Sequence, residues 1–297
     1  MPKVRSPLRN RAEEVLFLVA ARGIRALSPE GADAIGRRVG LAFRLLSASR
    51  RTLVDRNLAR AFPEMGREER HRLSRSVFAH FGSLAFDLVA TVGKPAEAIL
   101  RRVEVAGEEH AKAAYASGRG VFFLTAHLGN WEMAAIITSL LGMPIKVVVR
   151  PLDNPLLDRH LRAFRECGGN TVVPKATAAR ELFRILRSGG GVGILMDQHA
   201  HTPDAVPSPF FGRPAATTTA VARLADRTGA LVVPVFTLRV GPGRYRVEYG
   251  PPLDVQTLSS SEREAGPLTA RLNEITEGLI RRAPDQWLWL HNRWRLD

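Results

Sequence analysis

The sequence has one cysteine, Cys167, in 297 residues. A single cysteine cannot form a disulfide within the chain, so a fold held together by disulfides is excluded and a reducing compartment is expected. The chain also lacks a leader with a cleavage site, which argues against export. We therefore expect the protein to stay on the cytoplasmic side of the cell, with Cys167 as a small packing residue at a helix end.

The N-terminal region has no hydrophobic run of membrane-spanning length. Its apolar run covers residues 15–21 and is followed by Arg22 and Arg25, whereas a spanning helix needs about 20 apolar residues. We favour an interfacial helix, which makes the attachment peripheral or monotopic. The alternative is an ordinary amphipathic helix packed on the rest of the protein.

Acidic residues are scarce relative to basic ones, and aromatic residues are few. The chain has 43 Lys and Arg against 29 Asp and Glu, a formal net charge of +14. Thirteen basic and five acidic residues fall in residues 1–62, a net charge of +8. These charges are mixed with apolar residues and not with the aromatic platforms that bind single-stranded nucleic acid. We expect an anionic membrane surface as the partner, and no nucleic acid.

Two kinds of catalytic signature are absent from the sequence. No G-x-S-x-G serine elbow occurs in the chain, so a hydroxyl nucleophile would have to come from a substrate. His199 and His201 are close in sequence, but no Cys, His or acidic cluster at ligand spacing completes a metal site. We expect neither a metal ion nor a cofactor.

The sequence does contain an alternation of short apolar strands and helices. Strands are predicted at 103–106, 121–125, 145–149, 192–196, 231–240 and 245–249. Such alternation is typical of an α/β fold. We predict a mixed central sheet flanked by helices, with the last two strands joined as a hairpin through Gly241-Pro-Gly. Residues 1–94 are predicted to be an N-terminal helical, membrane-associating region and residues 95–297 the α/β core, in one integrated domain.

Helical patterns fill the N-terminal region. The segment Ser28-Pro-Glu is a helix-start signal, and apolar residues follow at helical spacing. These apolar positions are Ile35, Val39, Phe43 and Leu46. A longer amphipathic pattern predicts a helix over residues 67–92, closed by Gly93-Lys-Pro.

A histidine follows the predicted strand at 121–125. After His127 come Leu-Gly-Asn-Trp, and Glu132 begins a run of good helix formers, so His127 sits at a strand-to-helix turn. Five positions along an ideal helix span about 500°, so His127 and Glu132 cannot meet as helical neighbours. If the turn brings them together, Glu132 can orient one imidazole nitrogen and leave the other to accept a proton.

The helix N-terminus is also expected to keep His127 neutral before reaction. From spacing alone, a second interpretation stays open. His127 would then cap the helix, and Glu132 would only add a favourable charge to its first turn.

The segment His127-Leu-Gly-Asn-Trp-Glu132 resembles the H-x4-D/E box of the glycerolipid acyltransferase superfamily. Its HxGNWE form resembles that of the bacterial lipid A biosynthesis (lauroyl/myristoyl) acyltransferase family. Other segments resemble blocks of that family in the same order, and the similarity covers almost the whole chain. They are Asn57-Leu-Ala-Arg-Ala-Phe-Pro-Glu64, Arg150-Pro-Leu-Asp-Asn-Pro155, Met196-Asp197-Gln198, Pro209-Phe-Phe-Gly212, Val233-Pro-Val-Phe236 and Trp287-Leu-Trp-Leu-His291-Asn-Arg-Trp294.

The resemblance implies an acyltransferase with a glycerolipid acyltransferase-like fold at the cytoplasmic face of the inner membrane. It would move a fatty acyl group from an acyl carrier protein or CoA thioester to a hydroxyl of a membrane glycolipid. A lipid A precursor is the preferred acceptor, and a phosphatidylinositol mannoside-type glycolipid or a lysophospholipid is the alternative. A non-catalytic lipid-binding protein with this fold is the alternative from another class. Catalysis is assigned to His127 and Glu132.

Polar residues that follow predicted strands are candidates for substrate binding, because open α/β sheets bind ligands at these ends. Arg150 suits bidentate contact with phosphate, unless it pairs with a nearby aspartate. Asp197 and Gln198 could bind substrate hydroxyls or orient Arg150. Asn130 of the turn is a further substrate-binding candidate.

Two further roles are left open by the residues. The oxyanion of acyl transfer would be held by backbone N–H groups of the turn after His127 or by a basic side chain. The tryptophans at 287, 289 and 294 could form a membrane-facing edge with neighbouring arginines, but core packing is the favoured interpretation.

Overall fold

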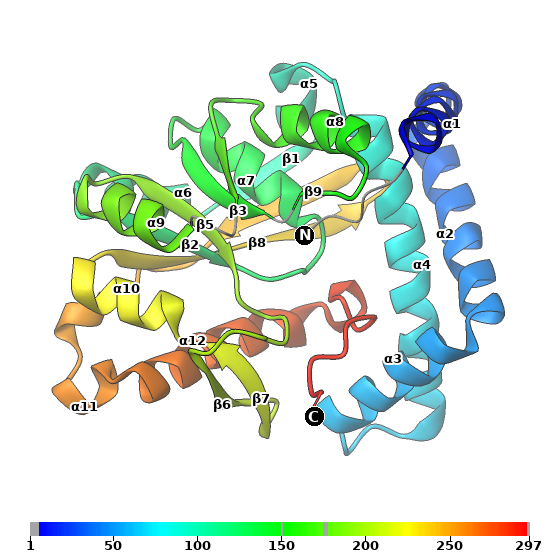
Figure 1. Cartoon of the computed structure of the whole chain (residues 1–297). Coiled ribbons are helices and arrows are strands. Elements are labelled where there is room, and N and C mark those ends of the chain that lie inside the picture. Colours follow the sequence, from blue (N-terminus) through cyan, green and yellow to red (C-terminus); the bar gives the residue numbers. More distant parts are fainter. Residues whose placement is uncertain (1–5, 150, 175–177, 296–297) are drawn as a thin grey trace.

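Helices come first in the chain. The computed structural model describes residues 6–149, 151–174 and 178–295 (Figure 1). The helices before the first strand are α1 (Pro7–Arg25), α2 (Pro29–Leu46), α3 (Ala48–Ala61), α4 (Arg67–Thr91) and α5 (Ala96–Leu100). The helix predicted over 67–92 is confirmed to within one residue, and it ends before Gly93, whose φ of +81° favours glycine.

A seven-stranded sheet follows, in the strand order β1-β9-β8-β2-β5-β3-β4. Neighbouring strands are parallel except β8 and β9, which form the predicted hairpin. The mixed α/β fold is therefore confirmed. Its elements are β1 (Val103–Ala106), α6 (Glu108–Ala116), β2 (Val121–Thr125), α7 (Trp131–Leu140), β3 (Ile145–Val149), α8 (Pro155–Arg165), β4 (Thr171–Pro174), α9 (Ala178–Arg187), β5 (Gly191–Leu195), β6 (Ala205–Phe210), β7 (Arg213–Thr218), α10 (Ala220–Thr228), β8 (Leu231–Gly241), β9 (Arg244–Tyr249), α11 (Ser260–Arg263) and α12 (Ala265–Arg282).

Three strands have no counterpart among the predicted ones. β4 has only four residues and lies at the edge of the sheet. β6 and β7 form a separate two-stranded antiparallel ribbon and contain Pro207, Pro209 and Pro214. Proline cannot donate to a ladder, so it argues against a strand in sequence patterns, although a two-stranded ribbon tolerates it at its open edges.

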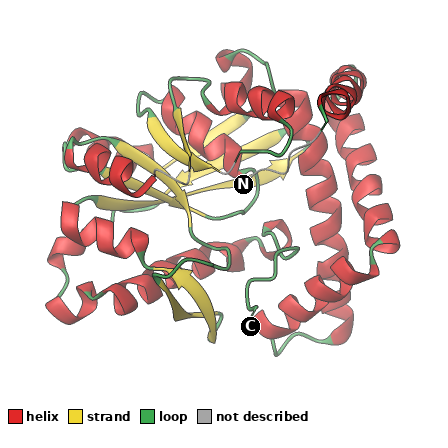
Figure 2. Cartoon of the chain, in the orientation of Figure 1, coloured by secondary structure: helices red, strands yellow, loops and turns green. Residues whose placement is uncertain are grey.

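Helices cover both faces of the seven-stranded sheet (Figure 2). Phe123 of β2 points to the face covered by α5, α6, α7 and α8. Its neighbour Phe122 points to the opposite face, where α9, α10 and α12 pack. Successive side chains of a strand alternate between faces, so every residue of β2 is buried.

A third apolar cluster joins the N-terminal helices to the end of the chain. Val54 of α3 and Phe78 of α4 belong to it, together with Phe210 and the tryptophans at 287, 289 and 294. All three tryptophans are buried. The prediction that they pack in the core is confirmed.

The face of α2 that packs is not its apolar stripe. Gly36 and Gly40 face Gly82 of α4, and a Cβ built on Gly40 would lie 2.0 Å from the carbonyl oxygen of Phe78. The two backbones are thus in direct contact. The apolar side chains that mark α2 in the sequence, among them Val39 and Leu46, are exposed instead.

α1 is held to α8 by polar contacts. The Asn154 side chain, which also caps α8, donates to the Asn10 carbonyl and to Glu13, while His160 of α8 contacts Glu14. Most of the apolar side chains of α1 point outwards. In the part of the chain that the structure describes, no helix is both long and apolar enough to cross a membrane.

Candidate active site

His127 lies just beyond the C-terminal end of β2, in the centre of the sheet. β2 pairs in parallel with β5, and Thr125 is registered opposite Leu195. Two residues beyond this pair, the segments that follow β2 and β5 place His127 and Asp197 side by side. The sheet register, and not a local motif, creates this pair.

Asp197 binds His127 through both of its carboxylate oxygens. Oδ1 lies 2.9 Å from His127 Nδ1, and Oδ2 accepts the backbone N–H of His127 at 2.9 Å. Oδ2 also accepts the indole N–H of Trp287 at 2.7 Å. The Asp197 side chain is 1% exposed, so these donors replace the water that it has lost.

The charges of this pair stabilise each other. Burial alone would raise the pKa of Asp197, but the charge of His127 and the hydrogen bonds from His127 and Trp287 outweigh it and lower that pKa to about 2. Burial alone would lower the pKa of His127, but Asp197 outweighs it and the pKa of His127 is raised. The expectation that the helix N-terminus keeps His127 neutral overlooked this carboxylate and gave the wrong direction for the shift.

The second ring nitrogen of His127, Nε2, is not held by Asp197, and the side chain is 19% exposed. In the neutral ring with Nδ1–H donated to Asp197, Nε2 has a lone pair and can accept a proton. The side-chain nitrogen of Gln198, Nε2, lies 3.3 Å from His127 Nε2, and the Gln198 side chain is exposed. Trp131 of α7 borders the imidazole, with ring centroids 5.0 Å apart.

Glu132 does not fold back onto His127, contrary to the predicted geometry. Its carboxylate is gripped by Arg165 of α8, whose Nε donates to Oε2 at 2.7 Å and whose Nη2 donates to Oε1. Asp197 already occupies His127 Nδ1. Glu132 lies close enough for its charge to help raise the pKa of His127, but it is not the group that orients the ring.

Asn130 is buried. Its side chain lies beside the hydroxyl of Tyr245, which donates to Asp87. Arg102 also pairs with Asp87. This geometry fits a structural role for Asn130 better than the predicted contact with substrate.

Backbone N–H groups of the turn are all used within the protein. Gly129 has a φ of +56°, and a Cβ there would lie 1.7 Å from the Thr237 carbonyl oxygen, so only glycine fits. The acceptors are the Asp197 carboxylate for His127, the Ala126 carbonyl for Leu128 at 2.7 Å, the Gln286 carbonyl for Gly129 at 3.0 Å and the Thr237 carbonyl for Asn130 at 3.3 Å. These four N–H groups are therefore not available to an oxyanion.

The end of the chain holds the loop that contains Asp197 and Gln198. Arg293 is completely buried and donates to the Gln198 carbonyl at 3.2 Å and to the Ala216 carbonyl at 2.6 Å. His291 Nε2 accepts the backbone N–H of His199 at 3.0 Å. Asn57 of α3 in turn donates to the carbonyls of residues 289 and 291, both at 2.8 Å. The sequence did not predict these supporting roles, although the residues lie in two of the segments that resemble blocks of the family.

Other predicted residues give less information. Arg150 lies outside the described residues. Cys167 is partly buried and packs at the margin of the core. The rings of His199 and His201 are 4.5 Å apart, but among the described residues no group of three or more His, Cys, Asp or Glu is placed to hold a metal ion.

Comparison with known proteins identifies the family. The sequence model described as bacterial lipid A biosynthesis acyltransferase matches residues 3–296. The chain is 32% identical to the lipid A biosynthesis lauroyltransferase of Escherichia coli (strain K12), over 86% of this chain and 82% of that protein. It is 26% identical to the lipid A biosynthesis palmitoleoyltransferase of the same organism, over 88% and 84% of the two chains.

A relative with another acceptor is also similar. The phosphatidylinositol mannoside acyltransferase of Mycolicibacterium smegmatis is 28% identical, over 82% of this chain and 79% of that protein. The family match over nearly the whole chain agrees with the motif resemblance. The chain belongs to the bacterial lipid A biosynthesis acyltransferase family and is an acyltransferase.

Proposed function

We propose that the protein transfers a fatty acyl group from an acyl thioester to a hydroxyl of a lipid A precursor. The observation that carries this proposal is the partly exposed imidazole of His127, with one nitrogen held by the buried Asp197 and the other beside the exposed side chain of Gln198. This is the arrangement of a general base with its orienting carboxylate. Names of the similar proteins supply the acceptor class.

In the proposed reaction the oxygen of the acceptor hydroxyl attacks the thioester carbonyl carbon. At the same time His127 Nε2 takes the proton of that hydroxyl. The tetrahedral intermediate then expels the thiolate, which takes the proton from the imidazolium. The products are an ester and a free thiol. Asp197 stays ionised throughout and stabilises the imidazolium.

The acyl donor is either an acyl carrier protein thioester or an acyl-CoA, since both present the same bond. Arg150 remains our candidate for a phosphate of the donor or acceptor. The reaction as written balances without a metal ion or a cofactor. Glu132 remains our second catalytic candidate. It would act through its charge near His127 and through its ion pair with Arg165.

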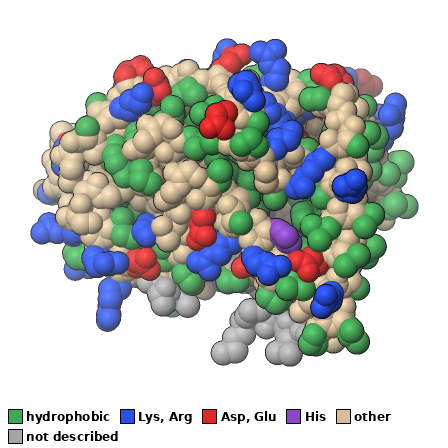
Figure 3. All heavy atoms as spheres, turned by 90° about the horizontal axis from the view of Figure 1, so that it is seen from above, with side chains coloured by type: hydrophobic (Ala, Val, Ile, Leu, Met, Phe, Trp, Pro, Cys, Tyr) green, Lys and Arg blue, Asp and Glu red, His purple; other side chains and the backbone are tan. Residues whose placement is uncertain are grey.

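We propose that α1 and α2 attach the protein to the cytoplasmic face of the membrane. Of fourteen exposed large apolar side chains among the described residues, eleven lie between Leu8 and Leu46. Figure 3 shows hydrophobic side chains along the edge of the molecule that these helices form. An apolar face of this kind suits peripheral binding in the headgroup region.

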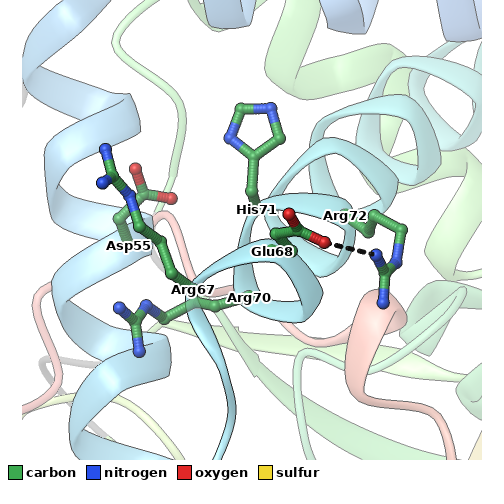
Figure 4. Close-up of a pocket in the computed structure, with 6 residues that line it drawn as sticks. All are labelled: Asp55, Arg67, Glu68, Arg70, His71 and Arg72. Atoms are coloured by element: carbon green, nitrogen blue, oxygen red, sulfur yellow. Dashed lines mark ion pairs between the residues drawn. The ribbon is translucent and has the colours of Figure 1, made fainter.

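Basic residues lie at one end of this apolar face. Arg44, in the last turn of α2, is itself buried, and its Nη2 lies 3.3 Å from His71 Nδ1. His71 lines a pocket between α3 and α4 whose other lining residues are Asp55, Arg67, Glu68, Arg70 and Arg72 (Figure 4). Its arginines outnumber its carboxylates, which favours contact with anionic headgroups.

An acyl-transfer assay tests the proposed function. The purified protein is incubated with a lipid A precursor and with acyl carrier protein or CoA thioesters. The masses of the product lipids are then measured by mass spectrometry. We expect a product heavier by one acyl group and a loss of at least about 10²-fold in His127→Ala, the low end of general-base contributions. A phosphatidylinositol mannoside in place of the precursor tests the second acceptor. Lipid binding with no acylated product would favour the non-catalytic alternative.

A further inference from the structure

The tetrahedral intermediate of acyl transfer has a negative oxygen that needs hydrogen-bond donors. In many acyl-transfer enzymes backbone N–H groups next to the catalytic residue supply them. Here the four N–H groups from His127 to Asn130 already donate within the protein. With these four N–H groups occupied, the side chains near His127 are the next candidates for the donor.

Gln198 is placed to do so. Its side-chain nitrogen lies 3.3 Å from His127 Nε2, the atom that receives the proton of the acceptor hydroxyl. The oxygen of the acceptor hydroxyl must come within about 3 Å of that nitrogen. In the intermediate this oxygen is bonded to the former carbonyl carbon. The amide therefore lies beside the position at which the oxyanion forms.

The orientation of the amide follows from the protonation of His127. In the neutral ring, with Nδ1–H donated to Asp197, Nε2 carries a lone pair, and only a donor is favourable beside it. The NH2 group of Gln198, not its carbonyl, then faces the reaction. An amide NH2 has two hydrogens, so one can move to the oxyanion when substrate enters.

The backbone of Gln198 is fixed although its side chain is exposed. The buried Arg293 donates to its carbonyl oxygen. On one side of it Asp197 is locked by Trp287, and on the other the N–H of His199 donates to His291. The fixed backbone keeps the start of this side chain beside His127, which limits the reorganisation needed to aim its amide at the developing charge.

From these contacts we infer that Gln198 is a catalytic residue whose side-chain amide donates a hydrogen bond to the oxyanion of the tetrahedral intermediate. The inference rests on the proposed acyl transfer and adds to it a second catalytic group, separate from the His127 base. Binding of an acceptor hydroxyl, which the sequence also suggested for Gln198, requires the amide in the ground state and not mainly in the transition state.

Gln198→Ala separates these two roles. We expect kcat to fall by about 10²- to 10³-fold, as for loss of one oxyanion donor, with the acceptor KM unchanged. Hydrolysis of a palmitoyl-CoA probe without acceptor lipid should fall by a similar factor, because water attack forms the same oxyanion. The pH dependence of the remaining activity should stay as in the wild type, since the base is intact.

Gln256→Ala is the matched control, because it removes another exposed amide, one that contacts Asp226 and Arg263. It should leave both rates unchanged. A kcat for Gln198→Ala within about threefold of wild type, a range far below the loss expected for an oxyanion donor, would overturn the inference. An increase confined to the acceptor KM would also overturn it and assign acceptor binding.

The same assays keep the two proposals apart. Activity that disappears in His127→Ala but survives in Gln198→Ala refutes the oxyanion role and leaves the proposed function standing. If the wild-type protein neither transfers an acyl group to a lipid nor hydrolyses the thioester, the proposed function and this inference both fail.

Discussion

Trp287 donates its indole N–H to Asp197 Oδ2 over 2.7 Å, although ninety positions separate the two residues in the chain. The same oxygen accepts the backbone N–H of His127. The carboxylate that orients the base is thus fixed from the far end of the sequence. Changes that never touch a substrate can therefore alter the chemistry at His127.

Trp287→Phe removes this donor and keeps most of the ring. We expect the free energy of unfolding to fall by about 1.5–3 kcal/mol, as for loss of a hydrogen bond to a charged group. Trp294→Phe is the control, because its buried indole donates to the neutral carbonyl of Phe210 and should cost about 0.5–1.5 kcal/mol. Urea denaturation measures both. Equal losses would mean that the contact with the carboxylate adds nothing.

Activity should depend on pH through His127. The base accepts a proton only when it is neutral, and its pKa is raised by Asp197, so kcat/KM should fall as the pH drops through a midpoint above about 6.5. Asp197→Asn removes the cause of the upward shift and should move this midpoint to lower pH, while lowering kcat by about 10²- to 10⁴-fold. The same midpoint in both proteins would contradict the pairing.

Glu132→Gln should destabilise the fold as well as reduce activity. It leaves the partly buried guanidinium of Arg165 without the anion that pairs with it, which costs on the order of 3 kcal/mol. The double variant Glu132→Gln/Arg165→Gln should recover stability but only part of the activity, since the charge of Glu132 supports the His127 imidazolium more strongly than the charge of Arg165 opposes it. Thermal unfolding and kcat are measured on the same samples. Full recovery of activity in the double variant would show that Glu132 acts only by neutralising Arg165.

Val39→Asp should weaken binding to anionic vesicles, because it places a charge in the apolar face of α2. Val240→Asp is the matched control, since Val39 and Val240 are both 49% exposed and Val240 lies on the β8–β9 hairpin. Co-sedimentation with phosphatidylglycerol vesicles compares them. Wild-type binding should also decrease as salt is raised. Equal binding of the two variants, or binding that survives high salt and carbonate extraction, would contradict peripheral attachment through this face.

Acyl transfer should proceed without a covalent acyl-enzyme, because the acceptor hydroxyl is the nucleophile. We expect intersecting double-reciprocal plots, and no added acyl mass on the protein after incubation with donor alone. Cys167→Ala should retain near-normal activity. A protein-bound acyl group that forms and decays at the rate of turnover would contradict direct transfer.

Sequence patterns predicted the helices and strands of this fold better than they predicted which strands lie next to each other in the sheet. Both His127 and Asp197 follow predicted strands, but no local pattern says that β5 lies next to β2 while β3 lies beyond it. The residues alone therefore assign Asp197 to substrate or to Arg150. Glu132 lies nearer to His127 in sequence, so sequence patterns favour it as the partner of the ring. In the structure its carboxylate pairs with Arg165, the last residue of α8, instead.

Prolines and glycines account for other differences. Pro207, Pro209 and Pro214 hide the β6–β7 ribbon from a pattern search. In α2 the apolar spacing predicts the helix correctly, but its apolar face is exposed, because the packing face is made of glycines that a hydrophobicity pattern does not register. Periodicity identifies a helix without saying which side is buried.

The glycine contact between α2 and α4 means that the outer face of α2 and the surroundings of His127 cannot vary independently. A methyl group on Gly40 would meet the Phe78 carbonyl and push α4 away from α2. Three residues after Phe78, the ring of Phe81 lies 6.5 Å from that of Trp131, which borders His127. A mutation in α2, the proposed membrane-binding helix, is thus coupled through one turn of α4 to His127, the proposed base, so we expect membrane affinity and turnover to change together among variants at Gly40.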